Sequence, residues 1–135
     1  MASGTKKRAV QESEIEDGLT ELCRANGVYQ HKNTGRNGIP DRLLVHQGRV
    51  WFLELKRPGE KPTALQEAVA RDLRRHGAVT LWADSHEAVR LVVAALVSGQ
   101  EPPRERLYGL PANLAKLAKL APGRAAGDKK NGGDI

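Results

Sequence analysis

Two short extended segments joined by a two-residue turn limit most strongly how this chain can fold. Residues 49–56, Arg49-Val50-Trp51-Phe52-Leu53-Glu54-Leu55-Lys56, are rich in β-branched and aromatic side chains and indicate a mostly buried strand. Residues 41–46 precede them, and only Gln47-Gly48 separates the two segments, which predicts an antiparallel hairpin. Because side chains two positions apart share a face of a strand, Glu54 and Lys56 should project together.

Asp41 begins the first strand of this hairpin and Glu54 lies near the end of the second, so their carboxylates should meet at one end of the sheet. Mg²⁺ and Mn²⁺ commonly bind one or two carboxylates together with waters and substrate phosphate oxygens. Lys56 is suited to orient or help deprotonate an attacking water, or to stabilise negative charge on a pentavalent phosphorus. These residues predict a site where a hard metal ion and a water are held together.

Each fragment of this pattern also has a simpler explanation. An Asp that follows Pro40 is often only a turn residue, and Glu-x-Lys on a strand is often a solvated pair of charges. The combination favours chemistry, because Glu54 and Lys56 end a run that is otherwise apolar.

A helix is expected at residues 11–25, where Ile15, Leu19 and Leu22 form an apolar stripe. Glu12 falls about 60° from Ile15 around the helix axis, whereas Glu14 lies about 100° away on the opposite flank. Glu12 is therefore the acid expected to point toward the metal. The alternative is that the acids in the first turns simply favour the positive N-terminal end of the helix dipole.

Between this helix and the hairpin, Gly27 ends the helical turn and residues 28–31 predict a short strand. The polar loop 32–38 follows. Lys32 and Arg36 lie in this loop just before the proposed metal ligand, and cationic side chains beside backbone amides suit a phosphate.

After the hairpin, two prolines in residues 57–62 exclude regular structure. Thr63 is a suitable N-cap for a helix that runs to about His76. The apolar stripe of this helix comprises Leu65, Val69 and Leu73. Gln66 lies in its first turn, where the amide is able to donate to a phosphate or a metal-bound water.

Residues 78–83 predict a buried strand, and Asp84 or Ser85 should cap a last helix through Val97. The core stripe of that helix comprises Val89, Val92, Val93 and Leu96. The order α-β-β-β-α-β-α predicts an α/β fold with a mixed four-stranded sheet flanked by helices.

Four stretches of the chain match a known family pattern. They comprise a helix with Glu, a Gly-x-Pro-Asp-Arg loop, a strand that ends in Glu-x-Lys and a helix that opens with Leu-Gln: Glu12-Ser13-Glu14-Ile15, Gly35-Arg36-Asn37-Gly38-Ile39-Pro40-Asp41-Arg42, Phe52-Leu53-Glu54-Leu55-Lys56-Arg57-Pro58-Gly59 and Leu65-Gln66. Over residues 11–97 the chain resembles the VRR-NUC branch of the PD-(D/E)XK nuclease superfamily, and the resemblance implies the restriction-endonuclease-like fold.

The resemblance also implies an activity. Asp41, Glu54 and Lys56 match the family's catalytic positions, and Gln66 matches its characteristic helix glutamine. Members are metal-dependent DNA nucleases, some of which act on branched structures. The implied reaction is hydrolysis of a DNA phosphodiester bond, with Lys56 at the water and Gln66 supporting the site. The expected metal site is one or two Mg²⁺ ions, for which Mn²⁺ can substitute, held by Asp41, Glu54, the Leu55 carbonyl and Glu12.

Contacts with the nucleic acid are expected from Lys32, Arg36, Arg42 and Arg57. The alternatives that stay open are a noncatalytic DNA-binding module on the same fold, and a nuclease of the same chemistry that differs in substrate, either one directed at RNA or a restriction enzyme. A homodimer with two active sites would suit symmetric cutting of a junction by an endonuclease, on analogy alone. No small-molecule organic cofactor is expected.

The net charge of +6 on 135 residues is unevenly distributed. Residues 11–100 carry 12 Lys and Arg against 12 Asp and Glu, whereas residues 1–10 add three positive charges and residues 101–135 add seven against four negative ones. Basic tails of this kind either steer DNA to the site or only aid solubility. We therefore divide the chain into a basic tail (1–10), a nuclease domain (11–99) and a basic extension (100–135) with one possible helix, 112–121, and a disordered end.

The chain contains one cysteine, Cys23, which predicts a half-buried helical thiol and neither a disulfide nor a cysteine-based zinc site. No apolar run approaches the length of a membrane span, and the first residues lack the apolar stretch of a signal peptide. A cytoplasmic location without membrane contact is expected.

Overall fold

The computed structural model describes residues 9–107 of the chain. Most of the basic N-terminal tail, the possible helix 112–121 and the end expected to be disordered lie outside the described residues. The elements follow the predicted order: α1 (Glu12–Asn26), β1 (Tyr29–Lys32), β2 (Arg42–His46), β3 (Arg49–Leu55), α2 (Ala64–Arg75), β4 (Val79–Ala83) and α3 (His86–Val97). A short 3₁₀ helix that was not predicted, η2 (Arg104–Arg106), follows. The expected boundaries were correct to within one or two residues.

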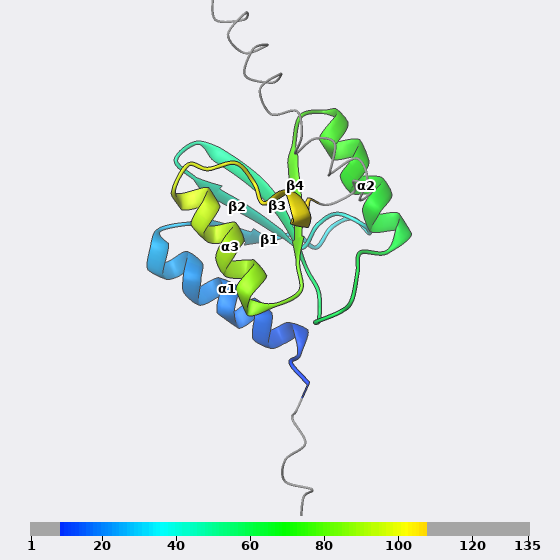
Figure 1. Ribbon diagram of the computed structural model, residues 1–135. Helices are drawn as coiled ribbons and strands as arrows, with labels where there is room; N and C mark the ends of the chain where they lie inside the picture. The colour runs from blue at the N-terminus through cyan, green and yellow to red at the C-terminus, as the bar shows by residue number, and fades with distance from the viewer. Residues whose placement is uncertain (1–8, 108–135) are drawn as a thin grey trace, which may run out of the picture.

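The four strands form one mixed sheet in the order β1-β2-β3-β4. β1 pairs with β2 and β2 with β3 in antiparallel fashion, whereas β4 lies parallel to β3. Figure 1 shows α1 and α3 side by side on one face of the sheet and α2 on the other. The predicted mixed sheet flanked by helices is therefore confirmed.

The hairpin between β2 and β3 turns at Gln47 and Gly48, whose φ angles are 52° and 81°. Positive φ at both central residues is what a type I′ turn requires, and this turn matches the twist of the flanking strands. The turn sets the register, in which Arg42 lies opposite Leu53. One residue further on, Asp41 comes opposite Glu54, which brings the two predicted carboxylates to the same end of the sheet.

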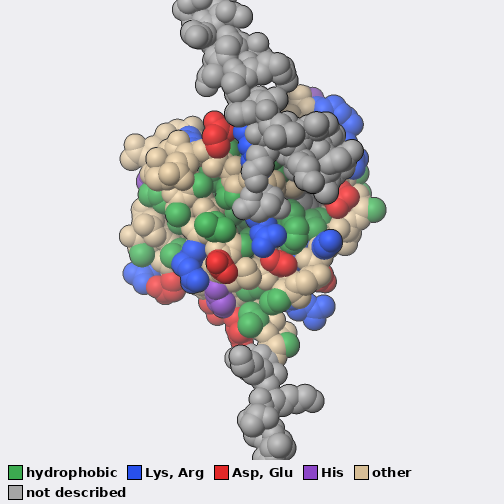
Figure 2. Space-filling view, in the orientation of Figure 1, with side chains coloured by type: hydrophobic (Ala, Val, Ile, Leu, Met, Phe, Trp, Pro, Cys, Tyr) green, Lys and Arg blue, Asp and Glu red, His purple; other side chains and the backbone are tan. Residues whose placement is uncertain are grey.

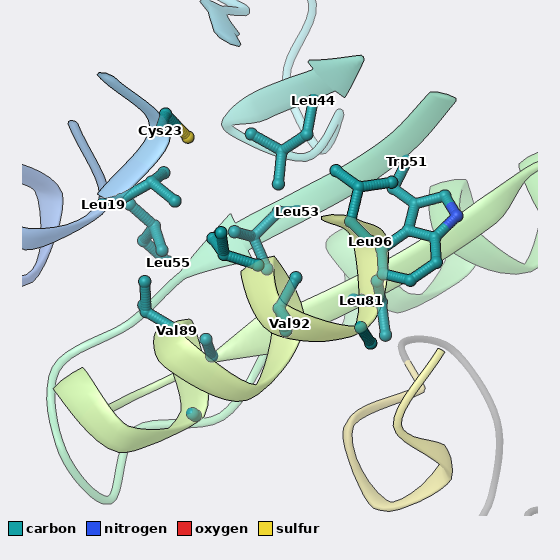
Figure 3. Close-up of a cluster of buried hydrophobic side chains, with 14 of the residues drawn as sticks. Leu19, Cys23, Leu44, Trp51, Leu53, Leu55, Leu81, Val89, Val92 and Leu96 are labelled. Atoms are coloured by element: carbon teal, nitrogen blue, oxygen red, sulfur yellow. The ribbon is translucent and has the colours of Figure 1, made fainter. Parts of the chain in front are cut away.

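The core lies between the sheet and the pair of helices α1 and α3. Figure 3 shows its side chains meeting from α1, α3 and three strands. Cys23 is only 2% exposed, so it is buried and not half-buried as expected. The buried stripe of α1 is Ile15, Leu19 and Cys23, while Leu22 lies partly buried at its edge. Burial raises the pKa of the Cys23 thiol to about 11, which makes it an unreactive core group.

Helix α2 differs from its prediction in one respect. Its buried residues are Val69 and Ala70, whereas Leu65, expected in the apolar stripe, is 53% exposed. The reason is that α2 packs against β4 and against the loop that precedes β2. Its first turn therefore contacts this loop at Gly38 and does not reach the core.

On the face shown in Figure 2, acidic and basic side chains are interspersed, in line with the neutral charge balance of residues 11–100. Among the described residues, no helix is long and apolar enough to cross a membrane.

Candidate active site

Asp41 and Glu54 lie at the end of the β2–β3 hairpin, and each is anchored by the neighbouring strand. The backbone N–H of Asp41 donates to Glu54 Oε1 at 3.2 Å. In return, Asp41 Oδ2 accepts from the backbone N–H of Leu55, also at 3.2 Å. Both carboxylates are thus oriented by main-chain donors, which the strands themselves hold in place.

The loop that delivers Asp41 is fixed at both ends. Asn33, just after β1, donates from its backbone N–H to the carbonyl of Asp41 at 2.7 Å and from Nδ2 to the carbonyl of Pro40 at 2.9 Å. In the same loop, Gly38 has φ of 88°, and a Cβ there would lie 2.9 Å from side-chain atoms of Leu65 and Val69. Only glycine allows this close contact between the loop and α2.

Glu54 lies on the face of β3 opposite the core, and Lys56 directly follows the strand and lies beside it, as predicted. They are nevertheless shielded from solvent, with exposures of 3% and 8%. Lys56 Nζ lies 3.7 Å from Glu54 Oε2. The Lys56 backbone is held as well, because its N–H donates to the Ala83 carbonyl at 2.9 Å and continues the parallel pairing beyond the end of β3.

Gln66 reaches this site from α2. Its Nε2 donates to Glu54 Oε2 at 2.9 Å, while its Oε1 accepts from the backbone N–H of Thr63 at 2.8 Å. Gln66 was predicted near the end of the Glu54 strand, and it lies there. Its partner is Glu54 itself, whereas the sequence suggested a phosphate or a metal-bound water.

The electrostatics of the site reflect crowded acids. Burial, followed by the charge of Asp41, raises the pKa of Glu54 to about 7, although Lys56 and the N–H of Asp41 act in the opposite direction. The pKa of Glu12 is also raised, first by partial burial and then by Asp41. Glu12 therefore lies close enough to Asp41 for the charge of that carboxylate to raise its pKa. It projects from the flank of α1 that the helical spacing indicated.

The donor set suits a hard divalent cation. Two carboxylates whose mutual repulsion and burial raise a pKa in this way would be stabilised by a cation between them. Ligation by the Leu55 carbonyl stays a prediction. Residues 9–107 contain no group of three or more His, Cys, Asp or Glu side chains placed to hold a metal ion. Ligation by Glu12 therefore stays a prediction, while the charge of Glu12 contributes to the raised pKa of Glu54.

The cations expected to contact nucleic acid divide into two groups. Lys32, Arg36 and Arg57 are exposed, although Arg57 Nε lies 3.6 Å from Glu60 Oε1. Arg42 is different: it is 8% exposed and its Nη2 lies 3.3 Å from Glu16 Oε1, beneath α1. β2 directs this side chain to the core face, as it does Leu44, so the contact of Arg42 with nucleic acid stays a prediction that its position does not favour.

Sequence reasoning missed two residues beside the site. Asn33 holds the Asp41 loop, and an Asn directly after a strand was its only local signal. Glu60 lies close enough to raise the pKa of Glu12, and it also accepts a hydrogen bond from the backbone N–H of Arg57. The spacing of Arg57 and Glu60 was visible in the sequence, but their position beside the acids was not.

Comparison with known proteins agrees with this geometry. No protein-family model matches the chain. A curated relative, "Putative nuclease p44" of Acyrthosiphon pisum secondary endosymbiont phage 1, is 38% identical over 87 residues, which are 62% of this chain and 85% of the relative. A solved structure described as "VRR_NUC domain" superposes with a TM-score of 0.58 at 28% identity, over 64% of this chain and 97% of that one. The chain belongs to the VRR-NUC family.

Membership in the VRR-NUC family confirms the resemblance read from the sequence and the fold that it implied. The matched part of the chain is large enough to include the hairpin, α1 and α2, which together build the site. In this VRR-NUC protein the two carboxylates and the lysine of the family pattern are brought together, and α2 contributes the glutamine to the same cluster.

Proposed function

We propose that this VRR-NUC protein is a nuclease that hydrolyses DNA phosphodiester bonds with Mg²⁺ or Mn²⁺ bound between Asp41 and Glu54. The observation that carries the proposal is the anchored pair itself: two carboxylates tied to each other's strands, with Lys56 Nζ 3.7 Å from Glu54. A buried cluster of this composition costs folding free energy, which a purely structural role would leave unexplained.

Asp41, Glu54 and the Leu55 carbonyl would hold the metal, which would polarise a phosphate oxygen and lower the pKa of a bound water. The strands keep the ligands in position before substrate arrives, because both carboxylates accept from backbone N–H groups. Lys56, on the same face, orients the water and stabilises the negative charge that develops on the phosphate oxygens.

The reaction needs no covalent intermediate. The water oxygen forms a bond to phosphorus, the bond from phosphorus to one ester oxygen breaks, and the departing alkoxide takes up a proton while the water loses one. Lys56 Nζ is the nitrogen of the cluster that is able to carry a proton beside this centre. Gln66 does not contact the reacting atoms in this scheme, since its amide is engaged by Glu54 and Thr63.

DNA is brought to the site by the exposed cations Lys32 and Arg36 in the loop between β1 and β2, together with Arg57 after β3. Both segments adjoin the carboxylate pair, so phosphate contacts there would place a backbone phosphate near the metal. Such contacts do not depend on base sequence and weaken with salt. A homodimer remains a prediction from analogy.

The test is cleavage of end-labelled duplex, flap, four-way-junction DNA and RNA with Mg²⁺, Mn²⁺ or EDTA. Asp41→Ala and Lys56→Ala should each abolish metal-dependent cutting. Asp72→Ala is the matched control: Asp72 is an exposed acid on α2 that pairs only with Arg75 among the described side chains, and its removal should leave the rate unchanged.

The substrate panel also separates the alternatives. Cutting of RNA alone would redirect the proposal to an RNA nuclease. Binding of DNA without cutting under either metal would favour the noncatalytic module, and wild-type cutting by Asp41→Ala would overturn the assignment of the site.

A further inference from the structure

The first turn of α2 is joined to the proposed metal site by an unbroken chain of hydrogen bonds. Thr63 and Gln66 form a capping box: Thr63 Oγ1 accepts from the Gln66 N–H at 3.2 Å, and Gln66 Oε1 accepts from the Thr63 N–H at 2.8 Å. Beyond the box, Gln66 Nε2 donates to Glu54 Oε2 at 2.9 Å. The side chain that completes a helix cap is thus also the one that holds a site carboxylate.

The two partners of Gln66 select a single orientation of its amide. The Thr63 N–H is only a donor, so it must face Oε1, and the ionised Glu54 is only an acceptor, so it must face Nε2. A flipped amide would bring an oxygen to within 2.9 Å of the carboxylate and an NH₂ against the backbone N–H. The cap therefore selects an orientation that a free glutamine would adopt only with a loss of rotamer entropy.

Glu54 depends on this donor more than an exposed acid would. It is 3% exposed, so water does not replace a lost hydrogen bond, and its Oε2 is also the oxygen that lies 3.7 Å from Lys56 Nζ. Without Gln66, Glu54 Oε2 loses the donor that orients it, and the carboxylate is held through Oε1 and the Asp41 N–H. Partners that orient a ligating carboxylate typically change metal affinity or activity by about 10–100-fold when removed.

We propose that Thr63 is a positioning residue for Glu54: through its backbone N–H it orients Gln66, and the cap of α2 thereby sets the affinity of the site for divalent metal. This inference rests on the proposed function, because it assumes that Glu54 ligates the metal. Thr63 then has two separable roles. The hydroxyl begins the helix, and the N–H fixes the amide.

Two substitutions separate these roles. Thr63→Ala removes the hydroxyl and keeps the N–H. Thr63→Pro removes both, and the backbone tolerates it because φ at this position is −73°, close to the value that proline requires. Gln66→Met removes the amide while keeping side-chain length, and it serves as the second variant should Thr63→Pro fold poorly.

The measurement is Mn²⁺ affinity of the full-length protein by isothermal titration calorimetry without DNA. We expect Thr63→Pro and Gln66→Met to weaken Mn²⁺ binding by about 10–100-fold. Thr63→Ala should weaken it by less than about threefold, well under that range. The double variant Thr63→Pro/Gln66→Met should bind Mn²⁺ no more weakly than whichever of the two single variants has the lower affinity. Both substitutions break the same chain of hydrogen bonds, so their effects should not add.

The matched control is Ser85→Ala at the N-cap of α3, whose hydroxyl accepts from the Ala88 N–H at 3.0 Å. The Ser85 hydroxyl caps its helix as that of Thr63 does, by accepting from the N–H three positions further along the chain. Ser85→Ala should lower the melting temperature about as much as Thr63→Ala and leave Mn²⁺ affinity unchanged. A loss of affinity in Ser85→Ala equal to that in Thr63→Pro would overturn the proposal, since general destabilisation would then explain both.

Cleavage at rising metal concentration provides a second readout. A positioning role predicts that Thr63→Pro recovers most of its rate at saturating Mn²⁺, whereas a group that contacts the reacting atoms would keep a lowered kcat. Asp41→Ala distinguishes failure of the metal site from failure of the cap. If Asp41→Ala still binds Mn²⁺ normally, the proposed metal site itself fails; if it does not, but Thr63→Pro and Gln66→Met bind as wild type, only the role of the cap is refuted.

Discussion

Asp41 and Glu54 each orient the other's end of the hairpin: the Asp41 N–H donates to Glu54 Oε1, and Asp41 Oδ2 accepts from the N–H of Leu55, the neighbour of Glu54. The exchange keeps two carboxylates close together in a site from which water is largely excluded. Their proximity is the physical origin of the pH behaviour expected of this protein.

Stability of the metal-free protein should fall as pH rises from about 5 to 8. The pKa of Glu54 is about 7 in the folded state and near its ordinary value of 4.5 in the unfolded chain, so the folded state binds the extra proton between these values. The stability gained from neutral Glu54 is complete below pH 4.5 and lost as pH passes 7. Thermal melts in EDTA at several pH values should show this decline, and it should be smaller in Glu54→Gln, which has no proton to lose.

Metal affinity should change with pH in the opposite sense. Metal binding requires ionised Glu54, so below pH 7 the apparent Mn²⁺ affinity should fall by up to about tenfold per pH unit. Above pH 7 the dependence should flatten. Calorimetric titrations at pH 6, 7 and 8 measure this directly, and equal affinity at all three would contradict the assignment of Glu54 as a ligand.

Gly38→Ala should destabilise the protein and impair the site. The position combines φ of 88° with a Cβ only 2.9 Å from side-chain atoms of Leu65 and Val69, so we expect a loss of about 1–3 kcal/mol in the free energy of unfolding. Gly35→Ala in the same loop is the control, because a Cβ there meets nothing within 4 Å. Urea denaturation measures both. Adding Leu65→Ala to Gly38→Ala should restore part of the stability by making room.

Arg42 and Arg36 should respond differently to removal. Arg42→Ala removes the cation that pairs with Glu16 beneath α1. We expect the free energy of unfolding to fall by about 2 kcal/mol, a value between those typical of exposed and of fully buried ion pairs. Arg36→Ala should change stability by less than about 0.5 kcal/mol. Instead it should weaken DNA binding and reduce the slope of log affinity against log salt by about 1. Fluorescence anisotropy at several salt concentrations tests the contrast, which equal effects on DNA affinity would refute.

Gln47→Asn should stabilise the hairpin. Gln47 has φ of 52°, a region that Asn adopts more readily than Gln, and Asn-Gly is the preferred pair in type I′ turns. Relief of the strain of the left-handed conformation should raise the free energy of unfolding by up to about 1 kcal/mol. A higher melting temperature with unchanged Mn²⁺ affinity is the expected result, and a lower one would mean that the Gln47 side chain has a role of its own.

The amino-acid sequence by itself determined the order of the elements, the hairpin and the place of Asp41, Glu54 and Lys56. These depend on local patterns: alternation with a period of two residues, a two-residue turn, and caps such as Thr63 and Ser85 at helix starts. A two-residue turn leaves almost no freedom in register, so the local pattern alone places Asp41 and Glu54 opposite each other.

Only the tertiary structure decided which partners the remaining residues have. Gln66 donates a hydrogen bond to Glu54 because α2 folds back over the end of β3. Arg42 lies beneath α1, where it forms an ion pair with Glu16. Asn33 and Gly38 acquire their roles from the same packing. Such contacts join elements that are distant along the chain. Their geometry depends on where each helix packs on the sheet, and local propensity and periodicity do not specify that position.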